Sequence, residues 1–369
     1  MIENGCYLGA LSQFARLVLI QAEKIEHWVG DEPLVRNALA NCIDFIAPTV
    51  PDLGKLAELQ CSSQTSGSEM ILSASCLKIM RTRGNLDGLD LRLLRALRTN
   101  IHMRYDAVTE ESRAALKAEV DRLAFPDASS AEYFIRQYLE PQVARAGCGN
   151  AEVWLLGDDE VFSHLRATLP IEWMSRFITL ALHPLDALFE MAAQYGNRTK
   201  LKRLIAERCS QYMCDWPVLD SSNNLEQLRI FWLIRAWYSL EEMPESYWNW
   251  LKTDKETLLL LQERSGRIRY NDYSYWRKLG PSKIEAILDA FIEKWPKVYL
   301  PDDWGTGSPK AEQAYRFLRE IVWILNSEDP DESIPVLNRL LGDSRFEDMH
   351  KDLKSIRTGQ IKKQALKNF

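Results

Sequence analysis

Apolar residues recur with a helical period along most of the chain, most clearly between residues 183 and 209. Two stripes with spacings of three and four residues stand there, first Leu185, Leu188, Phe189 and Ala192 and then Leu201, Leu204, Ile205 and Cys209. Such spacings place side chains on one face of an amphipathic helix. Gly196 and Asn197 separate the two stripes, so the sequence predicts two helices joined by a short turn.

A glycine followed by Asp or Asn separates helical-period segments at five places. These are Gly30-Asp31, Gly84-Asn85, Gly157-Asp158, Gly196-Asn197 and Gly342-Asp343. Glycine suits the left-handed conformation that ends a helix, and the polar residue after it can cap the next helix. The intervals between the turns are irregular, so no fixed-period repeat fits them. We therefore predict an all-α fold, an α-solenoid of degenerate antiparallel helical hairpins.

Strand patterning is confined to residues 151–156, AEVWLL, and a single strand has no partner with which to pair. We therefore expect the chain to contain almost no β structure.

Two loop-like stretches interrupt the helical pattern in the first half of the chain. Residues 61–68, CSSQTSGS, are the most polar loop of the first third, and residues 144–150, ARAGCGN, are the best candidate for a domain boundary. We predict an N-terminal helical-repeat part at 1–147 and a C-terminal part at 148–369, or one continuous solenoid. Nine of the twelve Trp residues follow Cys214, and we interpret them as an aromatic core of the C-terminal part.

The composition is that of an ordinary soluble protein, with 46% apolar and 27% charged residues. A net charge of −6 argues against a surface devoted to duplex nucleic acid. The first apolar stretch is broken by Gln13 and Arg16, so we expect neither a signal peptide nor a membrane span. Seven Cys residues without a CxxC pair predict no zinc site and no disulfide framework. We expect a cytoplasmic protein.

Catalytic and cofactor motifs are missing from the sequence. It has no GxxxxGK[ST] phosphate loop, no GxGxxG, no HExxH and no GxSxG. The five His residues stand singly on predicted helices or at their ends. We therefore predict no catalytic, cofactor-binding or metal-binding residue, and we expect the chain not to be an enzyme.

One segment mixes basic and aromatic residues in a way typical of a contact surface. Residues 264–278 carry Arg264, Arg267, Arg269, Tyr270, Tyr273, Trp276 and Arg277. Such side chains bind phosphates and stack on bases, and they are also common where proteins meet partners. We predict these seven residues as a partner contact, although a solvated helix with aromatic packing on one side is the alternative.

Three stretches together support a resemblance: the C-terminal AYRFLREIVWILNSEDPDESIPVLNRLLGDSRFEDMHKDLKSIRTGQIKKQALKNF, the segment SEMILSASCLKIMRTRGNLDGLDLRLLRALRTNI and residues 184–209. They are similar to the helical-repeat region that follows the ATPase module in bacterial NACHT-type proteins of the STAND NTPase class, from about residue 14 to the end of the chain. In that class the array recognises a trigger and restrains or releases oligomerisation. The phosphate loop and the acidic magnesium ligand of the ATPase module have no matching positions here.

The resemblance implies a non-enzymatic sensor or scaffold in antiphage defence. Its partner would be a protein trigger or an ATPase module, and the chain would be a piece of, or a product encoded beside, a longer polypeptide. The alternative is a nucleic-acid-associated helical accessory protein, with residues 264–278 and the basic tail 351–367 as contacts.

Overall fold

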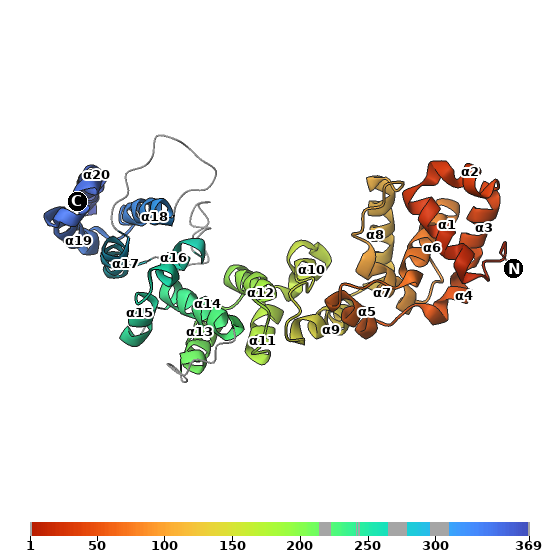
Figure 1. Cartoon of the computed structure of the whole chain (residues 1–369), viewed down its shortest axis with the longest axis horizontal. Coiled ribbons are helices and arrows are strands. Elements are labelled where there is room, and N and C mark those ends of the chain that lie inside the picture. Colours follow the sequence, from red (N-terminus) through yellow and green to blue (C-terminus); the bar gives the residue numbers. More distant parts are fainter. Residues whose placement is uncertain are drawn as a thin grey trace. The chain divides into compact units, whose positions relative to one another are not determined.

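The computed structural model describes residues 2–213, 223–240, 242, 244–264, 279–295 and 310–367. Within these ranges the protein is helical and contains no strand, which confirms the all-α prediction (Figure 1). The chain divides into two compact units, Met1–Asn197 and Arg198–Phe369. No helix in the described ranges is long and apolar enough to cross a membrane.

The first unit is built around one long helix, α6 (Gly67–Arg83), which is buried on most of its sides. Its helices are α1 (Leu8–Ile20), α2 (Ile25–Val29), α3 (Glu32–Asn41), α4 (Ile43–Ile46), α5 (Leu53–Cys61), α6 (Gly67–Arg83), α7 (Leu91–Asn100), α8 (Glu110–Ala124), α9 (Ala128–Ala144), α10 (Trp154–Asp158), α11 (Leu169–Arg176) and α12 (Leu182–Tyr195). Short 3-10 helices lie at Ala22–Lys24, Ala47–Thr49 and Glu160–Leu165. Helix α6 packs against α1, α3 and α7, while α5 packs against α9.

The second unit is a further set of paired helices. It contains α13 (Arg198–Met213), α14 (Asn223–Ser239), α15 (Glu245–Leu251), α16 (Lys255–Arg264), α17 (Pro281–Lys294), α18 (Lys310–Ile324), α19 (Pro330–Gly342), a 3-10 turn (Ser344–Met349) and α20 (His350–Lys367). Helix α13 packs on α14, and α19 packs on α20. The side chains of Trp232, Trp237, Trp250 and Trp295 are buried, as predicted for an aromatic core, whereas Trp323 is 45% exposed. Trp216, Trp276 and Trp304 lie outside the described residues.

The eight stripe residues between 183 and 209 are all buried, as their spacing predicts. Their two helices do not form a hairpin inside one unit, however, because the division between the units falls after Asn197. Helix α12 packs on α11, and α13 packs on α14. Residues 148–197, which we predicted to begin the C-terminal part, belong to the first compact unit.

Two of the five glycine turns have the predicted conformation. Gly30 and Gly84 end α2 and α6 with φ angles of 71° and 78°, and Asp31 caps α3 by accepting a hydrogen bond from the Leu34 amide at 2.9 Å. The prediction is wrong for the other three. Gly157 lies within α10, Gly342 is the last residue of α19, and Gly196 is extended, with φ −81° and ψ 172°.

Gly196 is nevertheless required, for a steric reason. A Cβ atom there would lie 2.5 Å from the carbonyl oxygen of Ala192 and 2.9 Å from Cδ1 of Ile171. We expect Gly196→Val to lower the free energy of unfolding by roughly 1 kcal/mol or more, because the added side chain forces apart α11 and α12. Thermal melts measure the loss. Gly342→Ala is the matched control, since a Cβ at Gly342 meets open space; equal losses in the two variants would contradict this explanation.

Candidate functional site

The predicted partner contact lies almost wholly outside the described residues. Arg264 is the last residue of α16, and its side chain is not among those described. Arg267, Arg269, Tyr270, Tyr273, Trp276 and Arg277 lie outside the described ranges altogether. Their role as a contact stays a prediction.

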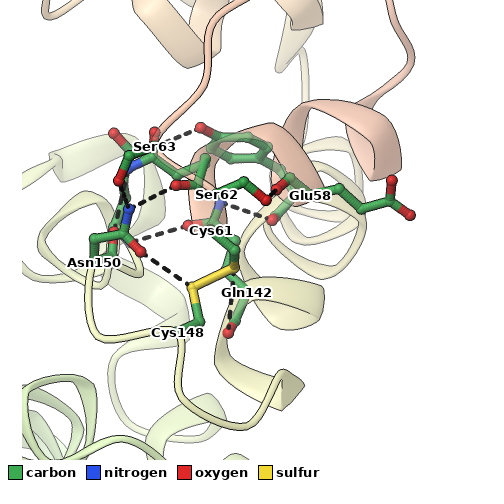
Figure 2. The surroundings of a disulfide bond; sticks show 10 residues. Glu58, Cys61, Ser62, Ser63, Gln142, Cys148 and Asn150 are labelled. Carbon is green, nitrogen blue, oxygen red and sulfur yellow. Dashed lines mark hydrogen bonds between the residues drawn. A yellow bond between two sulfur atoms is a disulfide. The ribbon is translucent and has the colours of Figure 1, made fainter.

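Within the first unit, reactive and polar side chains gather on residues 145–153, the segment that joins α9 to α10. Cys148 in this segment forms a disulfide with Cys61, the last residue of α5, with the two Cα atoms 5.2 Å apart (Figure 2). We predicted no disulfide framework, and the structure corrects this for one pair. The two cysteines are 87 residues apart, and only the packing of α5 on α9 brings them together.

Asn150 adds a non-covalent clamp to the same junction. Its Nδ2 donates to the carbonyl oxygen of Gln60 at 2.6 Å and to Oγ of Ser63 at 3.1 Å. In return, Nε2 of Gln60 donates to the carbonyl oxygen of Asn150 at 3.2 Å. The last carbonyls of a helix have no partner within that helix, so Asn150 satisfies one of them at the end of α5.

The chain reverses direction at this end of α5 with a residue in a conformation that is rare outside glycine. Ser63 has a φ of 52°. Its amide bonds the carbonyl of Gln60 at 3.0 Å, and the amide of Gln64 bonds that of Leu59 at 2.9 Å. This is the Schellman pattern, in which the left-handed residue is usually glycine. The turn therefore places the Ser63 hydroxyl where Asn150 reaches it.

A buried carboxylate holds the other end of the segment. Glu152 accepts a hydrogen bond on Oε2 from the Tyr138 hydroxyl at 2.5 Å, and its amide donates to Oε1 of Gln142 at 3.1 Å. Its Oε1 lies 3.5 Å from Nε2 of His102. The His102 ring in turn meets the ring of Trp154 edge to face, with their centroids 4.8 Å apart.

The environment of Glu152 favours its protonated form. Burial raises the pKa of Glu152 to about 6, and the negative charge of Glu69 on α6 adds to the shift, while the hydrogen bond from Tyr138 opposes it. Burial and the nearby carboxyl of Glu152 also raise the pKa of Tyr138. A carboxyl with a raised pKa is often a catalytic acid or base.

The geometry around Glu152 suits a structural contact better than acid–base catalysis. Burial lowers the pKa of His102, and the positive charges of Arg98 and Arg113 lower it further. Nε2 of His102 faces Glu152, and its Nδ1 atom is buried with no hydrogen-bond partner in the described part of the chain. Both oxygens of Glu152 already have neighbours within the protein. The Glu152 carboxyl is therefore held by Tyr138 and His102, and a substrate would have to displace one of them to exchange a proton with it.

A second buried charged cluster is centred on Arg98 of α7. Arg98 is almost fully buried and pairs with Asp121 on α8, Nε to Oδ1 at 2.6 Å, and with Asp159 just before the 3-10 helix at Glu160–Leu165. Lys117 bonds both carboxylates, at 2.7 Å and 3.0 Å. All charges of the cluster are matched within the protein, which indicates a role in holding α7 and α8 together.

An open hollow of about 380 Å³ lies at the first turns of α1 and α6. It is lined by Leu8, Gly9, Ser12, Thr49, Ser66, Gly67, Ser68 and Ile71. Most of its hydroxyl groups are already engaged, since Oγ1 of Thr49 donates to the Ile46 carbonyl at 2.7 Å and Oγ of Ser68 donates to that of Thr49 at 3.1 Å. At the start of α6, the Ser66 amide donates a hydrogen bond to Oε2 of Glu69 at 3.1 Å.

Leu8, which lines this hollow, and two apolar residues close in sequence to other lining residues, Tyr7 and Phe45, face solvent. Tyr7 is 56% exposed, Leu8 is 45% exposed, and Phe45, one helical turn before Thr49, is 40% exposed. We name these three residues the apolar rim. Three exposed apolar residues this close in sequence to the lining of one hollow differ from single exposed apolar residues, which are common on any surface.

Comparisons with models of known protein families, with curated proteins and with solved structures found no match. Within the described ranges no group of three or more His, Cys, Asp or Glu side chains could hold a metal ion.

The sequence did single out both segments that meet at the clamp. Residues 61–68 and 144–150 stand out as loops rich in Ser and Gly, and each contains one cysteine. The sequence does not signal that these cysteines pair, that Asn150 bonds the end of α5, or that Glu152 is buried. Glu152 belongs to the strand-like run 151–156, which instead leads into α10.

Proposed function

We propose that the chain is a non-enzymatic helical recognition module that binds a protein partner in the cytoplasm, as a sensor or scaffold in phage defence. The observation that carries the proposal is the exposure of the apolar rim, in which Leu8 lines the hollow at α1 and α6 and Tyr7 and Phe45 lie near other lining residues in sequence. The resemblance to the helical-repeat region of NACHT-type STAND NTPases supports an ATPase module or a trigger protein as the partner.

The chemistry of the hollow favours an apolar protein group over a polar small molecule. Its hydroxyls bond the protein's own backbone, so they add little to the binding of a polar ligand. The rim offers aromatic and aliphatic surface, and covering such surface releases roughly 25 cal/mol for each Å² removed from water. Aromatic residues also dominate the energy of protein interfaces.

The test is a change of the rim that leaves the fold intact. Tyr7→Ser, Leu8→Ser and Phe45→Ser together should abolish protection when the chain and its genomic neighbours are expressed in bacteria challenged with phage, as measured by plaque counts. The matched control is Ile361→Ser with Leu366→Ser on α20, two residues that are 44% and 77% exposed. Full protection by the rim variant, or no protection by the parent system, would contradict the proposal.

We also expect the purified chain neither to bind ATP tightly nor to hydrolyse it. Phosphate recognition of that kind needs a backbone cradle at a helix N-terminus and a group that coordinates the cation, and the sequence has no phosphate-loop motif. Phosphate release and equilibrium dialysis with labelled ATP measure both properties. Turnover of ATP at catalytic concentrations of the chain would contradict its assignment as a non-enzyme.

The alternative partner is nucleic acid, bound through the basic tail. Part of that tail is engaged with the protein's own groups, since Lys367 pairs with Asp329 at 2.8 Å and Lys363 donates to the Asn326 carbonyl. Lys354 and Lys362 remain exposed. Fluorescence anisotropy with labelled oligonucleotides decides between the partners, because phosphate contacts weaken steeply as salt is raised and a mostly apolar protein contact does not.

A further inference from the structure

The Cys61–Cys148 disulfide joins two segments that also bind each other without it. Asn150 and Gln60 exchange hydrogen bonds across the same junction, and the Ser63 hydroxyl accepts a third (Figure 2). The covalent bond is therefore not the sole contact that holds residues 145–153 on α5. Breaking it would leave a defined arrangement of the chain.

Each sulfur atom also has an oxygen acceptor beside it. Sγ of Cys148 lies 3.4 Å from Oδ1 of Asn150, and Sγ of Cys61 lies 4.0 Å from the carbonyl oxygen of Gln142. A disulfide has no proton to donate, whereas a thiol is a weak donor. These acceptors are thus useful only to the reduced pair, and the junction accommodates both oxidation states.

The two sulfurs differ in their access to solvent. Cys61 is half-buried at the end of α5, next to the exposed Ser62 and Ser63, whereas Cys148 is 4% exposed. A small thiolate therefore reaches Cys61 first. By contrast, burial raises the pKa of Cys209 to about 12, which suppresses its thiolate and its reactivity.

We propose that Cys61 and Cys148 form a reversible thiol–disulfide switch that exchanges with low-molecular-weight thiols and sets how firmly residues 145–153 are held on α5. The thiolate of a tripeptide thiol such as glutathione attacks Sγ of Cys61. The S–S bond breaks, and Cys148 leaves as a thiolate and takes up a proton. A second glutathione thiolate attacks the mixed disulfide, which releases the Cys61 thiol and glutathione disulfide. The reverse reaction, with glutathione disulfide as the oxidant, restores the bond.

The switch adds regulation to the first unit and does not depend on the partner proposed above. In the oxidised chain the bond closes an 87-residue loop, which restricts opening of the segment. In the reduced chain the hydrogen bonds of Asn150 and Glu152 and the packing of the buried Ala151 and Val153 hold it, without a covalent bond. Local opening then becomes more frequent, and a protease that cuts open segments reports on it.

Limited trypsin digestion of the full chain in glutathione buffers tests the switch. The exposed Arg145 offers a cleavage site inside the segment, and the exposed Arg83 at the end of α6 offers an internal reference. As the proportion of reduced glutathione rises, mass spectrometry after alkylation should show the pair passing from disulfide to dithiol. Cleavage after Arg145 should rise about tenfold relative to cleavage after Arg83.

Two variants separate the switch from general loosening. Cys61→Ser with Cys148→Ser should show the faster cleavage in every buffer, and Asn150→Ala should speed cleavage mainly in the reduced chain. The proposal fails if the disulfide never forms in oxidised glutathione, or if it resists reduction at every glutathione ratio. It also fails if the pair titrates while cleavage after Arg145 stays constant. The titration uses the parent chain, so it supports or overturns the switch even if the double variant does not fold.

Discussion

Replacement of Arg98 by Met is expected to lower the free energy of unfolding of the first unit by about 3–5 kcal/mol near neutral pH. Arg98 is 1% exposed and pairs with Asp121 and Asp159, whose side chains are 14% and 11% exposed. Removing it leaves two carboxylates close together in a poorly solvated place, with only Lys117 to balance them. Urea or thermal unfolding followed by circular dichroism measures the loss.

The aromatic neighbours of Arg98 add to the expected loss. Its guanidinium carbon lies 5.5 Å from the ring centroid of Phe162 and 6.0 Å from that of Phe125. A cation near aromatic faces is attracted to them, more strongly away from water. Met fills a similar volume, so the change removes charge and hydrogen bonds with little loss of packing.

The pH dependence of this variant identifies the cause. Burial pushes the pKa of Asp159 up, but the attraction and hydrogen bonds of Arg98 and Lys117 outweigh it, so its pKa lies below the ordinary value of 3.8. A carboxyl with a lowered pKa stabilises the fold above its unfolded pKa and loses this contribution as pH falls through the folded pKa. The gap between parent and Arg98→Met should therefore narrow below about pH 4.

Lys117→Met is the matched control, because Lys117 bonds the same two carboxylates but is 38% exposed. Water can replace an exposed ammonium, so its loss should be clearly smaller than that of Arg98. Equal losses from the two variants, or no loss from Arg98→Met, would contradict the role of a buried charge network.

The helical architecture was predictable because it depends on short-range patterns. The stripe residues between 183 and 209 are buried, and Gly30 and Gly84 end helices in the left-handed conformation. The path that the chain takes after each helix was not predictable from such patterns. Gly196 looks like the other turn glycines in sequence, yet its backbone is extended. Its missing side chain leaves room for the Ala192 carbonyl oxygen and the Ile171 side chain.

The candidate site was out of reach of the sequence because its members come from distant elements. Cys61, Asn150 and Glu152 have no local motif that would distinguish them from solvent-exposed loop residues. Helix α6 shows a related limit, since polar residues such as Ser73 and Ser75 are buried beside apolar ones. An amphipathic stripe predicts one buried face, and it does not reveal a helix covered on most sides.

Replacement of Glu152 by Gln is expected to stabilise the first unit by about 2 kcal/mol at pH 7.5 and to change its stability little near pH 4.5. The folded pKa of Glu152 is about 6, against an ordinary value of 4.5. A shift of this size corresponds to about 2 kcal/mol, since each pKa unit is worth about 1.36 kcal/mol. The amide keeps the shape of the carboxyl and an oxygen that can accept the Tyr138 hydroxyl.

The sign follows from where the protons bind. Between pH 4.5 and 6 the folded chain holds the Glu152 proton more tightly than the unfolded chain does. The parent therefore loses stability as pH rises through this window, and the full cost is present above it. Gln carries no such cost. Unfolding free energies of the parent and the variant, measured in urea from pH 4 to 8, should diverge across this interval.

Glu23→Gln is the matched control, because it removes the same charge from an exposed position. It should leave the pH profile nearly parallel to that of the parent. If Glu152→Gln is instead less stable than the parent near pH 6, then His102 is protonated there and its contact with the carboxylate at 3.5 Å is a stabilising ion pair. That result would mean that ionised Glu152 stabilises the fold. The contact that keeps residues 145–153 in place would then depend on the ionised form of Glu152.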